Sequence, residues 1–166
     1  HIVSRRQRQM CIRDSITTVP SMVVSIYGFP PVELVLFTLF GGTALAVSAN
    51  VLNQIFEIET DKLMARTSDR PLVTGTISVK NAYIYSILLA LIGFIILYTQ
   101  TTPLAAYIAL TANIFYSFIY TLILKPRTNQ NIVIGGAAGA APVLIGWAAT
   151  GTELDLSLIH ISEPTR

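Results

Sequence analysis

The residues best suited to chemistry form one polar block at positions 53–72, between long apolar runs. Asn53, Glu57 and Asp61 follow one another at four-residue intervals. A helix continuing out of the preceding apolar run would place their side chains on one face, and Asn50 lies one turn earlier on nearly the same line. Amide and carboxylate oxygens are ligands that suit a hard divalent cation such as Mg2+. The spacing therefore predicts a metal site formed by Asn53, Glu57 and Asp61.

A basic stripe accompanies this acidic one. Lys62, Arg66 and Arg70 repeat the four-residue spacing one residue out of phase, and Pro71 is expected to end the helix. Guanidinium groups can bind phosphate oxygens through two parallel hydrogen bonds. Carboxylates that hold Mg2+ beside such groups indicate a diphosphate site, with Arg66 and Arg70 contacting the phosphates. From spacing alone, the competing interpretation is a solvated helix end with pairs of opposite charge.

The block also matches a known pattern. Positions 53–72 read Asn-x3-Glu-x3-Asp-x2-Met-x-Arg-Thr-x2-Arg-Pro-Leu, which resembles the first aspartate-rich motif of the UbiA-type intramembrane prenyltransferases. A second stretch, positions 120–149, begins Tyr-Thr-Leu-Ile-Leu-Lys-Pro-Arg and is similar to the branch of that family that acts on protoheme IX. Two matches in the family's order and at its separation are more specific than either one alone.

The resemblance implies an all-α fold, a polytopic transmembrane helical bundle with about four to five of the family's nine helices present. It also implies transfer of a farnesyl group from farnesyl diphosphate to a vinyl group of protoheme IX (heme B), which gives heme O, with Mg2+ as cofactor. A second aspartate-rich motif would fall beyond residue 155, so this segment alone is expected to be inactive. The implied partners are farnesyl diphosphate, protoheme IX, the lipid bilayer, and heme A synthase or a terminal oxidase assembly.

Further substrate contacts are expected from the second stretch. Lys125 and Arg127 could close over the same diphosphate, although ordinary charge anchoring of a membrane loop explains them almost as well. Tyr120 could present its hydroxyl to the site, with interfacial anchoring as the alternative. Asn131 has a place in the matching stretch or caps a helix, and Asn50 completes the predicted substrate-binding set.

Apolar runs long enough to cross a bilayer surround these polar segments. A chain with 52% apolar residues belongs among integral membrane proteins. The predicted spans are Val32–Phe56, Asn81–Tyr98, Leu104–Leu124 and Ile132–Ala149, preceded by the latter half of another at Ile16–Ile26. By the positive-inside rule, loops 57–80 and 125–130 face the cytoplasm. The bacterial inner membrane is the expected location.

The two ends of the chain are expected to be artefacts. Residues 1–15 and 156–166 back-translate to sequencing-adapter strings that are reverse complements of each other, so residues 16–155 form the interpretable transmembrane domain. Cys11 and both histidines lie in those ends, which removes the residues that a thiolate, zinc or histidine mechanism would need. The interior has six basic and seven acidic residues, and no nucleic-acid partner is expected.

Two other functions fit parts of the sequence. A UbiA-type enzyme acting on a quinone precursor or a chlorophyll-like acceptor would share the acidic ladder but would not be expected to share the full pattern of Arg66, Arg70 and the second stretch. A transporter or membrane scaffold would explain the spans and the charge bias. It would not explain oxygen ligands at four-residue spacing followed by guanidinium groups, and it would be expected to have discontinuous helices near mid-membrane.

Overall fold

The computed structural model describes residues 16–65, 67–124 and 140–151, with side chains at 120 and 122–124 excepted. Four of the predicted site residues lie outside the described residues: Arg66, Lys125, Arg127 and Asn131. Residues 132–139 of the span predicted at Ile132–Ala149 also lie outside them, as do residues 1–15 and 152–166. The predictions made for them therefore stay predictions. Tyr120 is described only by its backbone.

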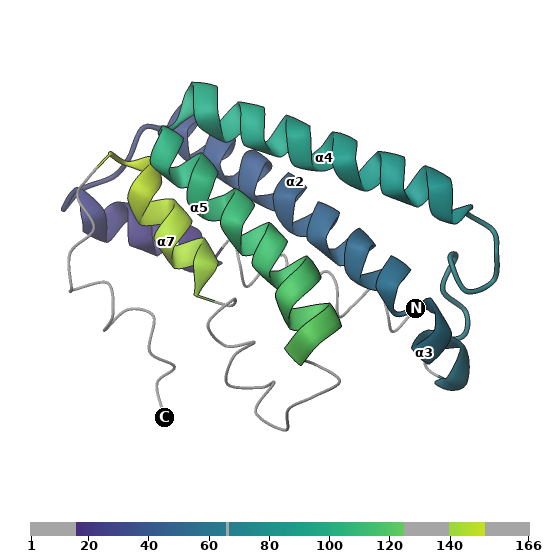
Figure 1. The fold of residues 1–166 in the computed structure, drawn as a ribbon. Coiled ribbons are helices and arrows are strands. Elements are labelled where there is room, and N and C mark those ends of the chain that lie inside the picture. The colour runs from purple at the N-terminus through teal and green to yellow at the C-terminus, as the bar shows by residue number, and fades with distance from the viewer. Residues whose placement is uncertain (1–15, 66, 125–139, 152–166) are drawn as a thin grey trace, which may run out of the picture.

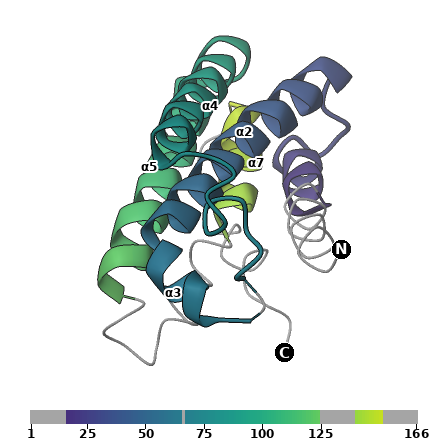
Figure 2. The same cartoon turned by 90° about the vertical axis from the view of Figure 1, so that its right-hand side faces the viewer.

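Within these ranges every regular element is a helix, as predicted. In chain order the elements are the helix Ile16–Ser25, α2 (Val32–Phe56), α3 (Ile58–Leu63), α4 (Val79–Gln100), α5 (Pro103–Ile114), the π-helix η1 (Phe115–Leu124) and α7 (Ala141–Ala149). Figure 1 shows α2, α4 and α5 side by side, with α3 at one end of the bundle. In Figure 2, α2 lies between the α4–α5 pair and the helix Ile16–Ser25.

Helices α2 and α4 approach closely because small residues line their contact. A Cβ atom placed on Gly93 would lie 2.7 Å from the carbonyl oxygen of Gly41, so neither backbone could come this near with a side chain there. Further along the same contact, the hydroxyls of Ser48 and Ser86 are 3.0 Å apart. The Ser86 hydroxyl also lies 3.1 Å from the Ser48 carbonyl oxygen, to which it can donate. The contact is tight and its hydroxyls are paired internally.

The end of the bundle away from α3 is joined by hydroxyl contacts. The Thr102 side chain caps α5 by accepting from the Ala105 N–H group, and it donates to the Ala148 carbonyl oxygen of α7 at 2.6 Å. The Ser25 and Thr150 hydroxyls are 2.8 Å apart, which links the first helix to the end of α7. These contacts connect the helix Ile16–Ser25, the start of α5 and the end of α7 at this end of the bundle.

Two of the described helices, α2 and α4, are long and apolar enough to cross a membrane. Large apolar side chains on α4 are exposed, among them Ile84, Leu88, Leu91 and Ile95. An apolar face of this length on a helix that could span the bilayer matches a lipid-exposed surface. The bounds of α2 and the break between α4 and α5 at Thr101–Thr102 agree with the sequence predictions.

Two helix predictions were wrong. The helix that carries the acidic residues was expected to reach Pro71, but it ends at Leu63, where Met64 takes an extended conformation. The buried Thr67 side chain donates to the Asp61 carbonyl oxygen at 3.0 Å, and such side-chain bonds compete with helix continuation. The span predicted as one α-helix at Leu104–Leu124 is instead α5 followed by η1.

Candidate functional site

The acidic ladder spans a break between two helices. α2 ends at Phe56, and Glu57 takes φ −100° and ψ 8° before α3 begins. The four-residue hydrogen-bond spacing nevertheless continues, because the Glu57 N–H group bonds the Asn53 carbonyl oxygen at 3.0 Å and the Asp61 N–H group bonds that of Glu57 at 2.8 Å. The predicted spacing is therefore retained although the predicted uninterrupted helix is not.

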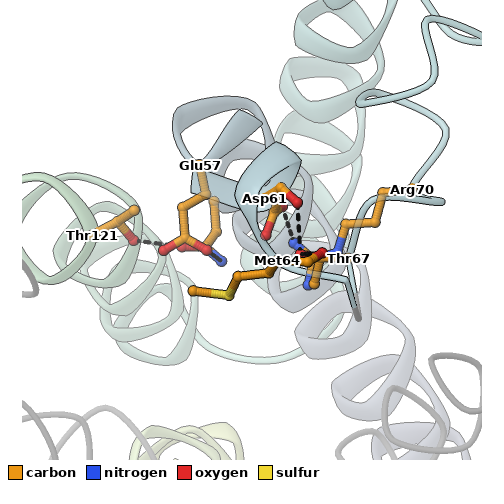
Figure 3. Close-up of polar contacts among 7 residues, drawn as sticks. Glu57, Asp61, Met64, Thr67, Arg70 and Thr121 are labelled. Carbon is orange, nitrogen blue, oxygen red and sulfur yellow. Dashed lines mark hydrogen bonds and ion pairs between the residues drawn. The ribbon is translucent and has the colours of Figure 1, made fainter. Parts of the chain in front are cut away.

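The Asn53 side chain forms hydrogen bonds with Glu57, on the same chain segment, and with Thr121, on the π-helix η1. Its Nδ2 atom donates to Glu57 Oε2 at 3.2 Å, and the Thr121 hydroxyl donates to its Oδ1 atom at 2.9 Å. Figure 3 shows Thr121 reaching toward the Glu57 side from a separate helix. Two members of the predicted ligand set, Asn53 and Glu57, are thus in contact, and η1 fixes one of them.

Asp61 lies in a separate contact a turn further along. It is buried, with 4% of its surface exposed, and its carboxylate forms an ion pair with Arg70. Arg70 reaches back to Asp61 from the turns that follow α3, as Figure 3 shows. A carboxylate removed from water needs such a partner. Arg70, predicted to contact phosphate, here neutralises a predicted metal ligand.

The other charges on α3 behave differently. Glu59 and Lys62 form an ion pair at 2.7 Å, but their side chains are 86% and 47% exposed. Exposed pairs of this kind contribute little to stability. Glu59 and Asp61 differ by only two positions, and yet one faces water while the other is buried against Arg70.

The donor set suits a hard cation in type. Asn53 and Glu57 supply an amide oxygen and a carboxylate, Asp61 supplies a second carboxylate, and such oxygen donors favour Mg2+ over softer metals. In the described part of the chain no three His, Cys, Asp or Glu side chains gather as a metal cluster. The predicted ligand set differs from such a cluster because it combines two carboxylates, Glu57 and Asp61, with the side-chain amide of Asn53.

Aromatic rings pack against one another at the carboxyl end of α2, beside the acidic residues. Phe56 packs on Tyr83 of α4 with ring centroids 6.5 Å apart and on Phe118 of η1 at 5.6 Å. α2, α4 and η1 therefore meet at the same end of the bundle as the polar block. Asn50, one turn before Asn53, is half-buried on α2.

The sequence analysis missed Thr121 and Thr67. Thr121 contacts Asn53, and Thr67 stabilises the turn that brings Arg70 back to Asp61. Thr121 had a detectable signal, because Asn113, Ser117 and Thr121 place buried polar side chains at four-residue intervals in an apolar span. Such a line inside a span points to the bundle interior.

Comparison with known proteins places this chain in a family. Protoheme IX farnesyltransferase from Pseudarthrobacter chlorophenolicus is 47% identical over 140 residues, covering 84% of this chain and 44% of its own length. The same-named protein from Paenarthrobacter aurescens is 48% identical over 140 residues, with the same coverage. The chain thus spans less than half the length of these curated relatives.

The fold has a solved counterpart. The apo structure of a UbiA homolog from Aeropyrum pernix K1 superposes with a TM-score of 0.66 at 21% identity, covering 94% of this chain and 56% of that one. The family model for the UbiA prenyltransferase family matches residues 15–163, which include the whole polar block. The fold and the sequence match agree, and the chain belongs to the UbiA prenyltransferase family.

Proposed function

We propose that the complete protein transfers a farnesyl group from farnesyl diphosphate to protoheme IX and so produces heme O. The observation that carries this proposal is the identity of 47% to a protoheme IX farnesyltransferase across 140 residues. The described geometry supports it, because the acidic and basic residues of the polar block lie together at the end where α2, α3 and η1 meet.

The proposed reaction breaks the bond between the farnesyl C1 atom and the diphosphate oxygen, and both electrons leave with the diphosphate. The vinyl group of the heme supplies the electrons of the new carbon–carbon bond. Water then adds to the cation left on the former vinyl group and loses a proton. Negative charge builds on the leaving diphosphate, so groups aimed at that anion lower the barrier most.

Asn53, Glu57 and Asp61 are the residues proposed to hold Mg2+, which when bound would neutralise diphosphate charge. Arg66 and Arg70 are proposed to bind the phosphates directly, with Lys125 and Arg127 closing from the next loop. Tyr120, Asn131 and Asn50 complete the proposed substrate-binding set.

Arg70 is proposed to exchange partners when substrate binds. In this structure its guanidinium group neutralises the buried Asp61 carboxylate. A diphosphate offers the same guanidinium stronger, forked hydrogen bonds, and a cation offers the Asp61 carboxylate a replacement charge. Each of the two groups would then keep a partner in both states.

The chain belongs to a family of integral membrane proteins, and its location is proposed to be the bacterial inner membrane, with loops 57–80 and 125–130 in the cytoplasm. The charge bias of those loops supports this orientation. It would admit the charged diphosphate from the aqueous side while the farnesyl chain stays in the bilayer. Association with heme A synthase or a terminal oxidase assembly would remove the apolar product.

The matched pair Asp61→Asn and Glu59→Gln tests the proposed role of the polar block. In the full-length enzyme carrying these residues, Asp61→Asn should reduce heme O formation by about 100-fold or more, because a proposed metal ligand is lost. Glu59→Gln alters an exposed acid on the same short helix and should leave the rate unchanged. Equal rates for wild type and Asp61→Asn, with unchanged Mg2+ dependence, would refute the metal site.

A further inference from the structure

The Thr121 hydroxyl lies within hydrogen-bond distance of two acceptor atoms but has only one proton to donate. Its hydroxyl lies 2.9 Å from Asn53 Oδ1 and also 2.9 Å from the Tyr116 carbonyl oxygen. A hydroxyl donates one hydrogen bond and accepts others through its lone pairs. It can therefore donate to Asn53, or it can donate to Tyr116 and accept from a donor on the Asn53 side.

The π-helix creates this choice. Tyr116 precedes Thr121 by five residues, which is the hydrogen-bond spacing of a π-helix, and both belong to η1. π-helical turns are rare and often mark functional sites. Thr121 is buried, at 6% exposure, so the Asn53 side chain faces a hydroxyl that water does not readily replace.

The orientation of the Asn53 amide depends on what lies beside Glu57. An amide can turn either its oxygen or its nitrogen toward a neighbour, and the surrounding partners decide which. Here the nitrogen faces Glu57 and the oxygen faces Thr121. A cation shared by Asn53 and Glu57 requires the amide oxygen on the Glu57 side, which turns the amide nitrogen toward Thr121.

We infer that Thr121 is a positioning residue that keeps Asn53 hydrogen-bonded in both amide orientations. With no cation bound, the hydroxyl donates to Asn53 Oδ1. With a cation bound, it accepts from Asn53 Nδ2 and gives its proton to the Tyr116 carbonyl oxygen. This inference rests on the proposed function, because it assumes that Asn53 and Glu57 hold a cation.

A valine in place of Thr121 keeps the shape and removes both hydrogen-bonding roles. In the cation-free state the half-buried Asn53 side chain can turn its oxygen toward water. In the cation-bound state the amide oxygen would be held toward Glu57, and the half-buried Asn53 nitrogen would face the buried valine side chain without a partner, which is unfavourable. The loss therefore falls on the bound state and weakens cation binding.

Binding of Mn2+ together with inorganic diphosphate to the full-length protein provides the test, with free Mn2+ followed by electron paramagnetic resonance and no prenyl substrate present. Thr121→Val should weaken binding about tenfold, and Thr121→Ser, which keeps the hydroxyl, should stay within about twofold of wild type. Ser117→Ala is the matched control, since Ser117 is fully buried on the same helix and its hydroxyl has no hydrogen-bond partner within the described residues. It should leave Mn2+ binding unchanged.

Repeating the Thr121→Val measurement in a protein that carries Asn53→Ala distinguishes an effect of Thr121 through Asn53 from a general packing effect. If Thr121 acts through Asn53, adding Thr121→Val to Asn53→Ala should have almost no further effect. Thr121→Ala takes the place of the valine variant if that variant does not purify. Binding by Thr121→Val, or by Thr121→Ala in its place, within twofold of wild type overturns the inference while leaving the proposed function intact, and so does an equal loss in both backgrounds. Absence of Mn2+ binding by wild type overturns both.

Discussion

Helix α2 carries two polar surfaces that are built in different ways. Toward α4 lies the packing contact of Gly41, Ser48, Ser86 and Gly93, in which uncharged small residues bring two backbones together and the hydroxyls bond to each other. At its carboxyl end lies the site end, formed by Asn53 with Glu57, Asp61, Arg70 and Thr121.

The packing contact and the site end differ in whether their hydrogen bonds and ion pairs are proposed to rearrange when a ligand binds. In the packing contact, Ser48 and Ser86 satisfy each other, and any other arrangement would separate the helices. At the site end, Arg70 is proposed to exchange Asp61 for a diphosphate. Thr121 is proposed to keep Asn53 as its partner while its own proton turns to the Tyr116 carbonyl oxygen. Polar groups in the first region therefore serve packing, whereas polar groups in the second region are proposed to rearrange when a ligand binds. The predictions that follow separate these two roles.

The largest effect is expected from Arg70→Ala at the site end. It leaves the buried Asp61 carboxylate without a counter-charge, which should lower the free energy of unfolding by about 3 kcal/mol. The double variant Asp61→Asn with Arg70→Ala removes both charges and should recover most of that stability without restoring heme O formation. Denaturation of the detergent-solubilised protein measures the stability of the single and the double variant. A loss below about 1 kcal/mol for the single variant would argue against a buried pair.

A smaller effect is expected from Gly93→Ala in the packing contact. Its Cβ atom would meet the Gly41 carbonyl oxygen at 2.7 Å and Leu45 at 3.0 Å, so overpacking should cost about 1–3 kcal/mol. Gly42→Ala is the control, because a Cβ atom there meets nothing within 4 Å. Thermal denaturation compares the two, and equal melting temperatures would mean that α2 and α4 are not in such close contact.

Ser86→Ala should lower stability by about 1 kcal/mol, because the buried Ser48 hydroxyl loses its bond to Ser86. Ser48→Ala should cost less, because the Ser86 hydroxyl keeps the Ser48 carbonyl oxygen as its acceptor. The double variant should cost less than the sum of the two. The concentration of Mg2+ that gives half-maximal activity should not change in any of them. A shift in that concentration would show that the packing contact and the site end are coupled.

The smallest effect is expected from Lys62→Ala. Its pair with Glu59 is exposed to water, so stability should change by less than about 0.5 kcal/mol. The same stability assay measures it. A change above about 1 kcal/mol would place Lys62 in the site end rather than on the surface.

Local signals in the sequence predicted several elements well. The apolar run predicted α2 at Val32–Phe56. The Ser78 side chain, just before the next apolar run, caps α4 by accepting from the Asn81 N–H group. Asn113, a polar residue within an apolar span, faces the bundle interior and donates to the Leu45 carbonyl oxygen at 2.7 Å. Each of these features depends on neighbouring residues or on burial of a single polar group in an apolar span.

Features that depend on tertiary contacts were not predicted. Helix periodicity extended the acidic helix to Pro71, because it takes no account of Thr67 bonding the Asp61 carbonyl oxygen. Periodicity over about two turns does not separate a π-helix from an α-helix, so η1 was missed, and with it the contact of Thr121 with Asn53. The ion pair of Arg70 with Asp61 was not predicted either, because residue type indicated a phosphate contact for Arg70, which stays a proposal.

The most direct test is the identity of the product. The full-length protein, reconstituted in lipid vesicles with Mg2+, would be incubated with farnesyl diphosphate and protoheme IX, and the hemes separated by chromatography and identified by mass. The proposed function predicts a farnesylated, hydroxylated heme that forms only when both substrates and the metal are present. Unchanged protoheme, together with prenylation of an aromatic quinone precursor offered in its place, would contradict it.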